Sequence, residues 1–557
     1  MTNRRIQAVS NTAWACCAAA AICFLGACGG SAPSEISETS NVVADSRGEV
    51  TKTKASSAAQ ATADAAGNGD AIAHVDTDVD IDAMLAEFLE SAAASNDEPY
   101  REPLFVDWPE PEFVLFVTGQ QRGFIEPCGC TGLTNQKGGL VRRHTLTREL
   151  TERGWPIVPV DVGNQVRRFG PQAEIKFQVT IEGLKQMGYQ AIAFGPDDLR
   201  LSAGGLASLT IGEGSNGSEF VSANTAIFDP EFTPRYLIVE AAGRTIGITA
   251  VLGEVEQARI TSDEIVKQPA DEALQSVWPE LAAADCDLYV LLAHTSIDES
   301  IRLAQAFPYF DVVVTAGGAD EPPYQADPIP ETDSILVQVG GKGMHVSVVG
   351  YFGDDDERLR YQRVPLDARF EDSREMMTLL ASYQEQLKAL GLEGLEVRPI
   401  PHPSGDAFVG SEACKDCHQK EYDIWKNTSH SYALDSLVYP NERVEVPRHF
   451  DPECLSCHVV GWNPQMHFPY VSGYLSLAAT PHMQHVGCET CHGPGAGHVD
   501  AETLHAANDE LLKKFRERVR LPLSEAERKC MECHDLDNSP DFHAPGAFEY
   551  YWGQVEH

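Results

Sequence analysis

Four copies of one short cysteine–histidine pattern lie in the last 150 or so residues of this 557-residue chain. In each copy two residues separate a pair of cysteines, and a histidine directly follows the second cysteine. The copies are Cys414-Lys-Asp-Cys417-His418, Cys454-Leu-Ser-Cys457-His458, Cys488-Glu-Thr-Cys491-His492 and Cys530-Met-Glu-Cys533-His534. With 15 Cys and 18 His in the whole chain, about 0.01 such matches are expected by chance. The repeated pattern therefore constrains the chemistry of this region more than any other feature.

Two thiols three residues apart can attach to the two vinyl groups of one haem, and the adjacent histidine can bind its iron. Paired cysteines can also form zinc sites, but such sites do not explain a histidine after every pair. We therefore predict four covalently attached haem c groups. Their predicted cofactor-binding cysteines are Cys414, Cys417, Cys454, Cys457, Cys488, Cys491, Cys530 and Cys533, and their proximal iron ligands are His418, His458, His492 and His534.

The remaining histidines are concentrated in the same region. Fourteen of the 18 histidines lie between His402 and His557, and only four of them belong to the repeated pattern. This enrichment is what ligation of several haem irons by two histidines each requires.

The pattern and its surroundings resemble the tetrahaem cytochromes of the c-554/c-552 type over about residues 405–557. The similar segments are Gly410-Ser-Glu-Ala-Cys414 with Ser429-His430, Gly487-Cys488 to Gly495 with His498, and the ending with Tyr551-Trp552 and His557. The resemblance implies distal iron ligands at His430, His498 and His557. It leaves the second haem, on His458, with an open or differently filled sixth position. The chain departs from the family by additional histidines that could close that position, namely His449, His482 and His485.

The N-terminus predicts export. Arg4 and Arg5 precede an apolar run over residues 13–25 that is too short to span a bilayer. The run ends in Leu25-Gly26-Ala27-Cys28, which resembles the lipobox of bacterial lipoproteins and implies lipid attachment to Cys28. An ordinary secretory signal is the alternative. We expect residues 1–28 to be the signal and residues 29–110 a flexible tether, because residues 29–97 contain few large apolar side chains.

The charge balance limits the partners. The chain has 42 Lys+Arg against 83 Asp+Glu, a formal net charge of −41. Such a surface repels nucleic acid, so nucleic acid is excluded as a partner. The acidity fits docking of redox partner proteins, such as basic cytochromes or a membrane quinol-oxidising complex, and equally a generally solvated acidic surface. We expect the lipid on Cys28 to anchor the chain to a membrane, with the folded part in the periplasm or at the cell surface.

The middle of the chain alternates apolar runs with amphipathic stretches, which predicts a layered α/β domain over residues 111–370. Strands are expected at 113–117, 157–160, 191–194, 236–239, 246–251, 288–292, 312–314, 335–339 and 346–351, and helices at 140–152, 176–187 and 297–306. Apolar residues at helical spacing predict a linker helix within 371–404. The chain is therefore expected to be multidomain, with a mainly α and irregular multihaem cytochrome c domain over residues 405–557.

The fragments of the α/β region follow the order of the metallophosphoesterase domain of periplasmic 5′-nucleotidases, which they resemble. Examples are Lys137-Gly138-Gly139, Asp161-Val-Gly163-Asn164, Ser222-Ala-Asn224 and Leu291-Leu-Ala-His294. The resemblance implies a layered αββα fold, and a two-metal site that requires carboxylate and imidazole ligands. In this chain those positions hold Gln120, Arg122, Asn164, Pro196 and Asp197, with His294 retained and Asp198 and Asp320 as weak substitutes. Because an arginine repels a divalent cation, we expect a retained fold whose metal site is lost.

Three further cysteines fall outside both the repeated pattern and the predicted signal. Cys128 and Cys130 lie two residues apart in a glycine-containing loop and could form a redox pair, a metal-binding pair or a structural pair. Cys286 precedes an apolar run and is expected to be a small core residue.

Three functions remain open from the sequence. They are electron transfer with the α/β domain as scaffold or docking module, oxidation or reduction of a small nitrogen or sulfur compound at one open haem, and an active phosphoesterase. The haem pattern favours the first two, and the replaced metal ligands count against the third.

Overall fold

The computed structural model describes residues 102–127, 136–212, 218–353, 357–439 and 446–557. These residues belong to one compact unit that spans Glu98–His557. The predicted signal with Cys28, nearly all of the predicted tether and the Cys128–Cys130 pair lie outside the described residues. No helix in the described ranges is both long and apolar enough to cross a membrane.

The first half of this unit contains a five-stranded mixed sheet in the order β13-β12-β1-β2-β3. The central strand β1 runs parallel to β2 and antiparallel to β12. The strands are β1 (Phe113–Thr118), β2 (Ile157–Asp161), β3 (Ala191–Ile192), β12 (His345–Tyr351) and β13 (Leu359–Pro365).

A second, six-stranded sheet has the order β10-β11-β9-β8-β6-β5. Strands β6, β8, β9 and β11 run parallel to one another, β5 pairs antiparallel with β6 at one edge, and β10 pairs antiparallel with β11 at the other. The strands are β5 (Tyr236–Ala241), β6 (Arg244–Leu252), β8 (Leu288–His294), β9 (Val312–Thr315), β10 (Asp327–Pro328) and β11 (Ile335–Gln338).

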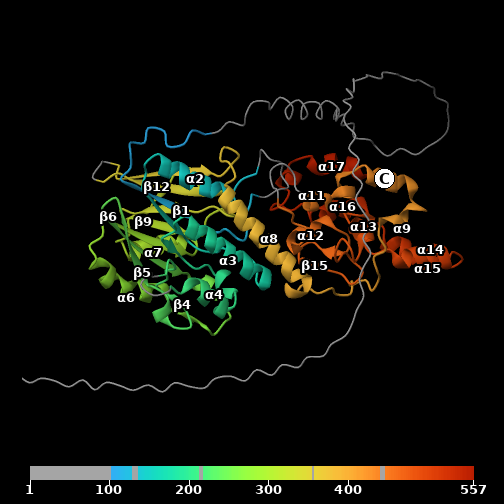
Figure 1. Ribbon diagram of the computed structural model, residues 1–557, viewed down its shortest axis with the longest axis horizontal. Coiled ribbons are helices and arrows are strands. Elements are labelled where there is room, and N and C mark those ends of the chain that lie inside the picture. Colours follow the sequence, from blue (N-terminus) through green and yellow to red (C-terminus); the bar gives the residue numbers. More distant parts are fainter. Residues whose placement is uncertain (1–101, 128–135, 213–217, 354–356, 440–445) are drawn as a thin grey trace, which may run out of the picture. The chain divides into compact units, whose positions relative to one another are not determined.

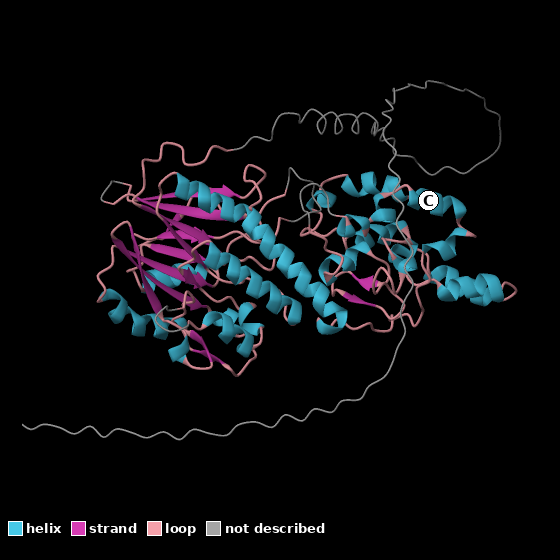
Figure 2. Ribbon diagram, viewed as in Figure 1, coloured by secondary structure: helices cyan, strands magenta, loops and turns pink. Residues whose placement is uncertain are grey.

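The two sheets pack face to face between helical layers (Figures 1 and 2). Successive side chains of a strand point to opposite faces. Accordingly Leu115 and Val117 of β1 pack against the second sheet, whereas Phe116 packs against the helices over the first sheet. The layered αββα arrangement predicted for this region is confirmed. The helices over the first sheet are α2 (Leu140–Glu152), α3 (Pro171–Gln186) and α8 (Arg374–Gly394), and those over the second are α6 (Ala270–Ala282) and α7 (Ile297–Ala306).

Smaller elements complete the α/β region. Strands β4 and β7 pair antiparallel apart from the two large sheets. These elements are η1 (Asp198–Arg200), α4 (Ala203–Thr210), β4 (Thr225–Ile227), η2 (Pro230–Phe232), α5 (Glu254–Gln257) and β7 (Ile265–Lys267).

The C-terminal region consists of short helices joined by long loops, as expected. Its elements are α9 (Ser411–Lys415), α10 (Gln419–Lys426), η3 (Ser429–Tyr432), α11 (Asp435–Val438), α12 (Pro452–His458), β14 (Trp462–Asn463), β15 (Phe468–Pro469), η4 (Pro481–Met483), α13 (Cys488–His492), α14 (Ala496–Leu504), α15 (Asp509–Arg518), α16 (Leu523–Cys530), η5 (Pro540–His543) and α17 (Ala547–Val555).

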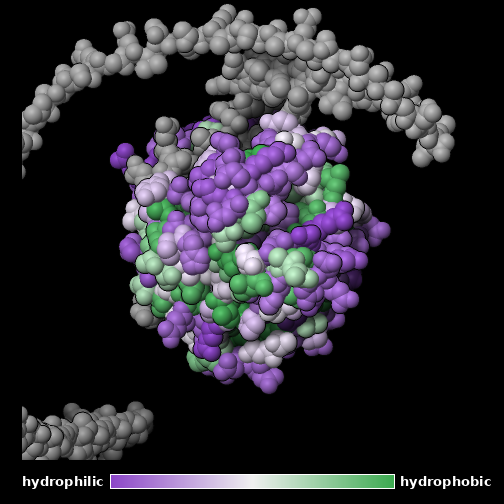
Figure 3. All heavy atoms as spheres, turned by 90° about the vertical axis from the view of Figure 1, so that its right-hand side faces the viewer, coloured by the Kyte–Doolittle hydropathy of each residue, from purple (hydrophilic) through white to green (hydrophobic). Residues whose placement is uncertain are grey.

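The apolar core of this region is small. Its cluster contains ten buried apolar residues, among them Trp462 and Tyr474, whereas the α/β region has three larger clusters. Large apolar side chains such as Leu504 and Leu536 are exposed instead, and apolar patches are visible between polar ones in Figure 3.

Candidate functional site

Each of the four cysteine–histidine motifs is built on a helical turn. Helices α12 and α13 contain a whole motif, while α9 and α16 end within theirs. In those two the turn continues, because the His418 N–H donates to the Cys414 carbonyl and the His534 N–H to the Cys530 carbonyl, both at 2.9 Å. Residues three and four apart share one face of a helix. Both thiols and the imidazole of a motif can therefore meet one ligand.

The cysteines of the motifs are available for covalent attachment. All eight thiols are free of disulfide bonds, as is Cys286. Cys286 precedes β8 and is only partly buried, so the expectation that it lies in the core is wrong. The local reason is a hydrogen bond from its backbone N–H to the Tyr289 hydroxyl at 3.0 Å, which holds it in the turn before the strand.

Three motif histidines face a second imidazole. The ring centres are 6.2 Å apart for His418 and His498, 6.2 Å for His430 and His534, and 5.7 Å for His492 and His557. Two imidazoles that each place a nitrogen about 2 Å from one metal, on opposite sides, have ring centres about 6 Å apart. The three pairs thus have the spacing of axial ligands to a shared iron, and the residues fit a haem.

Hydrogen bonds orient the motif histidines for ligation. Nδ1 of His458 donates to the Ala433 carbonyl at 2.7 Å, and Nδ1 of His492 donates to the Val519 carbonyl at 2.8 Å. Because Nδ1 carries the proton in both residues, Nε2 keeps the lone pair that binds a metal. Burial lowers the pKa of His458 and His492, which favours this neutral form.

His430 has the most depressed pKa among the predicted distal ligands. Burial, followed by the nearby His534 and His458, lowers the pKa of His430 to about 4. A neutral imidazole is the form that binds metals. His430 is therefore neutral at neutral pH, in the form that can bind a metal ion.

The second motif differs from the other three. Among the described residues, the imidazole–imidazole ring contacts pair His418, His492 and His534 but not His458. Of the additional histidines, His449 lies against Phe450 with ring centres 3.9 Å apart and the rings tilted by 41°, and its buried Nδ1 has no hydrogen-bond partner. His482 is exposed, and His485 keeps a buried Nδ1 without a hydrogen-bond partner.

Buried polar contacts fix the second motif to the α/β region. Asp451 caps the N-terminus of α12 and accepts hydrogen bonds from Tyr383 of α8 at 3.0 Å and Gln172 of α3 at 2.8 Å. Next to it, Lys176 of α3 pairs with Glu453 at 2.6 Å. Burial alone would raise the pKa of Glu453, but Lys176 and then Arg168 lower it to about 2. The helix that carries Cys454, Cys457 and His458 is thus held by charges from α3.

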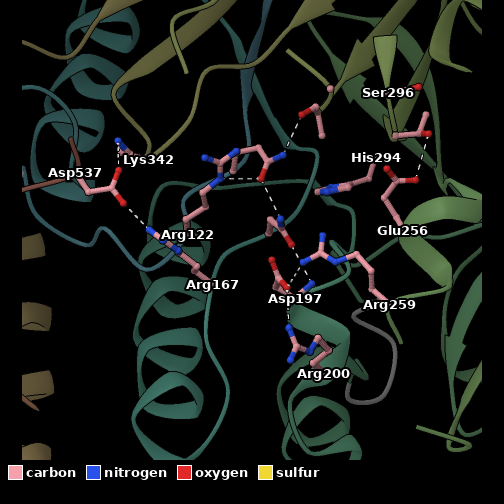
Figure 4. A pocket seen from close by; sticks show the side chains of 15 residues that line it. Arg122, Arg167, Asp197, Arg200, Glu256, Arg259, His294, Ser296, Lys342 and Asp537 are labelled. Atoms are coloured by element: carbon pink, nitrogen blue, oxygen red, sulfur yellow. Dashed lines mark hydrogen bonds and ion pairs between the residues drawn. The ribbon is translucent and has the colours of Figure 1, made fainter. Parts of the chain in front are cut away.

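The α/β region contains a cavity of about 720 Å³ where the nucleotidase resemblance places its metals (Figure 4). The structure brings Gln120, Arg122, Asn164, Asp197 and His294 together there, as the sequence comparison of these positions implied. The full lining is Gln120, Arg122, Asn164, Arg167, Asp197, Arg200, Glu256, Arg259, His294, Thr295, Ser296, Ala316, Gly317, Lys342 and Asp537.

The residues at the positions that the resemblance assigns to metal ligands form a polar network. Gln120 Oε1 accepts from Asn164 Nδ2 at 3.0 Å and from Arg122 Nε at 3.3 Å. His294 Nδ1 donates to the Val162 carbonyl at 2.6 Å, and burial lowers its pKa to about 4. Within the described ranges, no three His, Cys, Asp or Glu residues are placed to hold a metal ion together.

The possible substitute carboxylates are engaged elsewhere. Asp320 forms an ion pair with Arg122 at 3.0 Å, and Asp197 forms one with Arg259 at 2.5 Å. Asp198 is fully buried and accepts backbone N–H groups, including those of Asn164 and Gln165 at 2.8 and 2.7 Å. It therefore supports the loop structure and does not line the cavity.

The sequence did not reveal the cationic lining of the cavity. Arg167, Arg200, Arg259 and Lys342 come from separate loops and elements, so no local motif connects them. Asp537 comes from the C-terminal region, three residues after His534. Only the tertiary fold places these five residues at one opening.

The C-terminal region matches a cytochrome family. Residues 413–493 match the family "Cytochrome c554 and c-prime". A curated relative, cytochrome c-554 of Nitrosomonas europaea, is 34% identical over an alignment of 151 residues, and the match covers 24% of this chain and 60% of the relative. The chain thus spans less than two thirds of that relative. The match implies covalently attached haem c in this region.

Solved structures similar to the chain include several hydrolases. A 5′-nucleotidase precursor from Thermus thermophilus has 19% identity and a TM-score of 0.43, and the match covers 54% of this chain and 62% of that chain. A sulfate thiohydrolase from the same organism has 13% identity and a TM-score of 0.42, with 52% of this chain and 63% of that chain covered. The NAD nucleotidase of Haemophilus influenzae has 12% identity and a TM-score of 0.41, with 54% of this chain and 64% of that chain covered.

Proposed function

We propose that this chain is a multihaem c-type cytochrome that carries four haems and transfers electrons between redox partners. The observation that carries the proposal is the spacing of the three imidazole pairs, 5.7 to 6.2 Å between ring centres. An iron with two histidine ligands has no free position and therefore suits electron transfer without substrate binding. Haem supplies the one-electron chemistry when bound.

The residues of the chain hold and orient the cofactors. The eight motif cysteines attach them, and the motif histidines bind the irons through Nε2. Backbone carbonyls of Ala433 and Val519 fix the tautomers of His458 and His492. Ligation by His430, His498 and His557 brings together segments that are far apart in sequence, and this makes the haems part of the core.

A direct test is the mass of the intact polypeptide after non-covalent haem has been extracted with acid. We expect the mass to exceed that of the lipidated polypeptide by four haem masses. Replacing Cys491→Ser should weaken attachment of only the third haem, whereas the control Cys286→Ser should leave all four attached, because Cys286 lies outside the motifs. Three or fewer attached haems in the wild-type protein would refute the proposal.

The proposal includes anchoring through lipid on Cys28, with the folded part in the periplasm or at the cell surface. It assigns the α/β region the role of scaffold or docking module. Arg122 at a former ligand position, paired with Asp320 at 3.0 Å, supports this role because it opposes a divalent cation. Redox partners with a basic surface fit the acidic chain, as basic cytochromes or a membrane quinol-oxidising complex would.

A second candidate function is oxidation or reduction of a small nitrogen or sulfur compound at the haem of His458. It is favoured by the lack of an imidazole ring contact for His458 among the described residues. If this function holds, the reduced protein should bind carbon monoxide or nitric oxide at one haem in four. If no haem binds either gas, the second candidate is wrong and the carrier role stands.

A further inference from the structure

The lining of the cavity in the α/β region has a net positive charge, opposite in sign to the net charge of the chain. Five cationic side chains line it against three carboxylates, and Asp320 pairs with Arg122 and Lys342 from outside the lining, whereas the whole chain has 42 Lys+Arg and 83 Asp+Glu. The cations are Arg122, Arg167, Arg200, Arg259 and Lys342, and the carboxylates are Asp197, Glu256 and Asp537. A local excess of positive charge in an acidic protein concentrates anions at that site.

The cations share their carboxylate partners, so several of their N–H groups remain open to the cavity. Asp197 pairs with Arg259 at 2.5 Å and with Arg200 at 3.4 Å. Asp537 pairs with both Arg167 and Lys342 at 2.5 Å. The side chains of Arg167 and Arg259 are 51% and 47% exposed. Figure 4 shows the guanidinium groups around one opening, with His294 beside it.

We propose that this cavity binds a phosphate or sulfate group through its arginines and Lys342, without a metal ion. A guanidinium presents planar pairs of N–H donors that match two oxygens of such a group. His294 donates from Nδ1 to the Val162 carbonyl and leaves Nε2 unprotonated, so it can accept the P–OH proton of a hydrogen phosphate, whereas sulfate has no proton to donate. The volume of about 720 Å³ exceeds that of an inorganic ion and lies in the range of about 300–1,000 Å³ typical of small-molecule sites.

The binding site includes a residue that follows the fourth haem motif. A bound anion competes with Asp537 for Arg167 and Lys342. The backbone N–H of Asp537 is bonded to Asp535 at 3.0 Å, and in the same turn the Ser539 hydroxyl contacts His534 Nδ1 at 3.1 Å. Displacement of Asp537 therefore changes the surroundings of His534. This coupling rests on the proposed ligation by His534, whereas anion binding itself does not.

The binding test is calorimetric titration of the haem-loaded protein with inorganic phosphate, sulfate and adenosine monophosphate, with a metal chelator present. We expect saturable binding. Arg259→Gln should weaken it about tenfold or more, because a charge-assisted hydrogen bond is lost. Asp537→Asn should strengthen it, because a competing charge is removed. The control Arg302→Gln should not change it, because Arg302 pairs with Asp271 and Glu299 on the surface outside the cavity.

The outcomes separate the explanations. Tighter binding of adenosine monophosphate than of phosphate identifies an organic monoester as the ligand class, and equal binding identifies the inorganic ion. Absence of binding, binding only without chelator, or equal affinities of wild type and Arg259→Gln would overturn the proposal. Unchanged haem spectra and melting temperatures of the variants show that folding is not the cause.

The coupling is tested by redox titration with and without saturating phosphate. Coupling between two sites is reciprocal, so a tenfold difference in phosphate affinity between oxidised and reduced protein equals a shift of about 59 mV in one haem potential. We expect a shift in wild-type protein and a much smaller one in Asp537→Asn. Equal potentials under both conditions, in a protein that binds phosphate, would refute the coupling and leave the binding site standing.

Discussion

Single histidines illustrate how tertiary structure assigns partners. His430 follows the first motif in the sequence, but its ring faces His534 of the fourth motif at 6.2 Å. His498 follows the third motif and faces His418 of the first. The family resemblance could name these residues as ligands, but their pairing depends on contacts between segments about 80 to 104 residues apart, which no local pattern encodes.

Removing one distal histidine should affect one haem. We expect His557→Ala to make the haem on His492 high-spin, because the imidazole 5.7 Å from it is lost. The measurement is optical and paramagnetic resonance spectroscopy of the oxidised protein. His505→Ala is the matched control, since His505 is exposed after α14, and it should leave the spectrum unchanged. An unchanged spectrum of His557→Ala would show that another residue binds this iron.

At the scale of elements, the contact of α3 with α12 links the α/β region to the second motif. Lys176→Met should destabilise the protein by about 1–3 kcal/mol, because the half-buried Glu453 would keep only its longer pair with Arg168 at 3.5 Å. Denaturant unfolding measures this loss. Lys185→Met on the same helix is the control. Lys185 and Glu219 are 3.9 Å apart, and the side chain of Lys185 is 40% exposed. The free energy of unfolding of this control should therefore change by at most about 1 kcal/mol. Equal losses in both variants would contradict the role of the buried pair.

The same ion pair predicts a pH dependence. The pKa of Glu453 is about 2 in the folded protein, against the ordinary glutamate value of 4.5. A carboxylate whose pKa is lowered by folding stabilises the fold above its unfolded pKa. This contribution should therefore be lost as pH falls from about 4.5 to about 2. Unfolding curves of wild type and Lys176→Met should converge over this interval, and a constant difference between them would refute the assignment.

The sequence predicted the regular core elements better than the edges. All nine predicted strands and all three predicted α/β helices are present, because buried strands and amphipathic helices have clear periodicities. The linker helix is present as α8. Strand β13 escaped prediction because its residues are mostly half-buried and polar. Helix α6 escaped because it contains Pro279, which argues against a helix.

At the scale of the whole molecule, the α/β region and the C-terminal region differ in the size of their apolar cores. The α/β region has three extensive apolar clusters, whereas the C-terminal cluster has ten buried residues. So small a core cannot offset the conformational entropy lost by a region of this length. Asp537 reaches the cavity from this C-terminal region, so its place in the cavity was not predictable from the sequence.

Protein produced without haem attachment should therefore lose only part of its structure. Hydrogen exchange should show strands β1, β2, β6 and β8 protected in both forms, and helices α9 to α17 protected only in the haem-loaded form. Equal protection of the C-terminal helices with and without haem would show that their polypeptide core suffices.

Whether the α/β region is an active phosphoesterase can be tested separately. Purified protein supplied with Mn²⁺ or Zn²⁺ should not hydrolyse nucleotides or phosphodiesters, because the charge of Arg122 at an expected ligand position opposes a dication and the amides of Gln120 and Asn164 bond to each other. Metal-dependent turnover that disappears in His294→Ala would establish an active phosphoesterase and remove the scaffold role.

The central claim is that three of four motif histidines share their iron with a second imidazole and His458 does not. Low-temperature electron paramagnetic resonance of the oxidised, fully haem-loaded protein tests it most directly, because it separates low-spin from high-spin irons. We predict three low-spin signals and one high-spin signal for each chain. Four low-spin irons would contradict the open position at His458, and fewer than three would contradict the imidazole pairs.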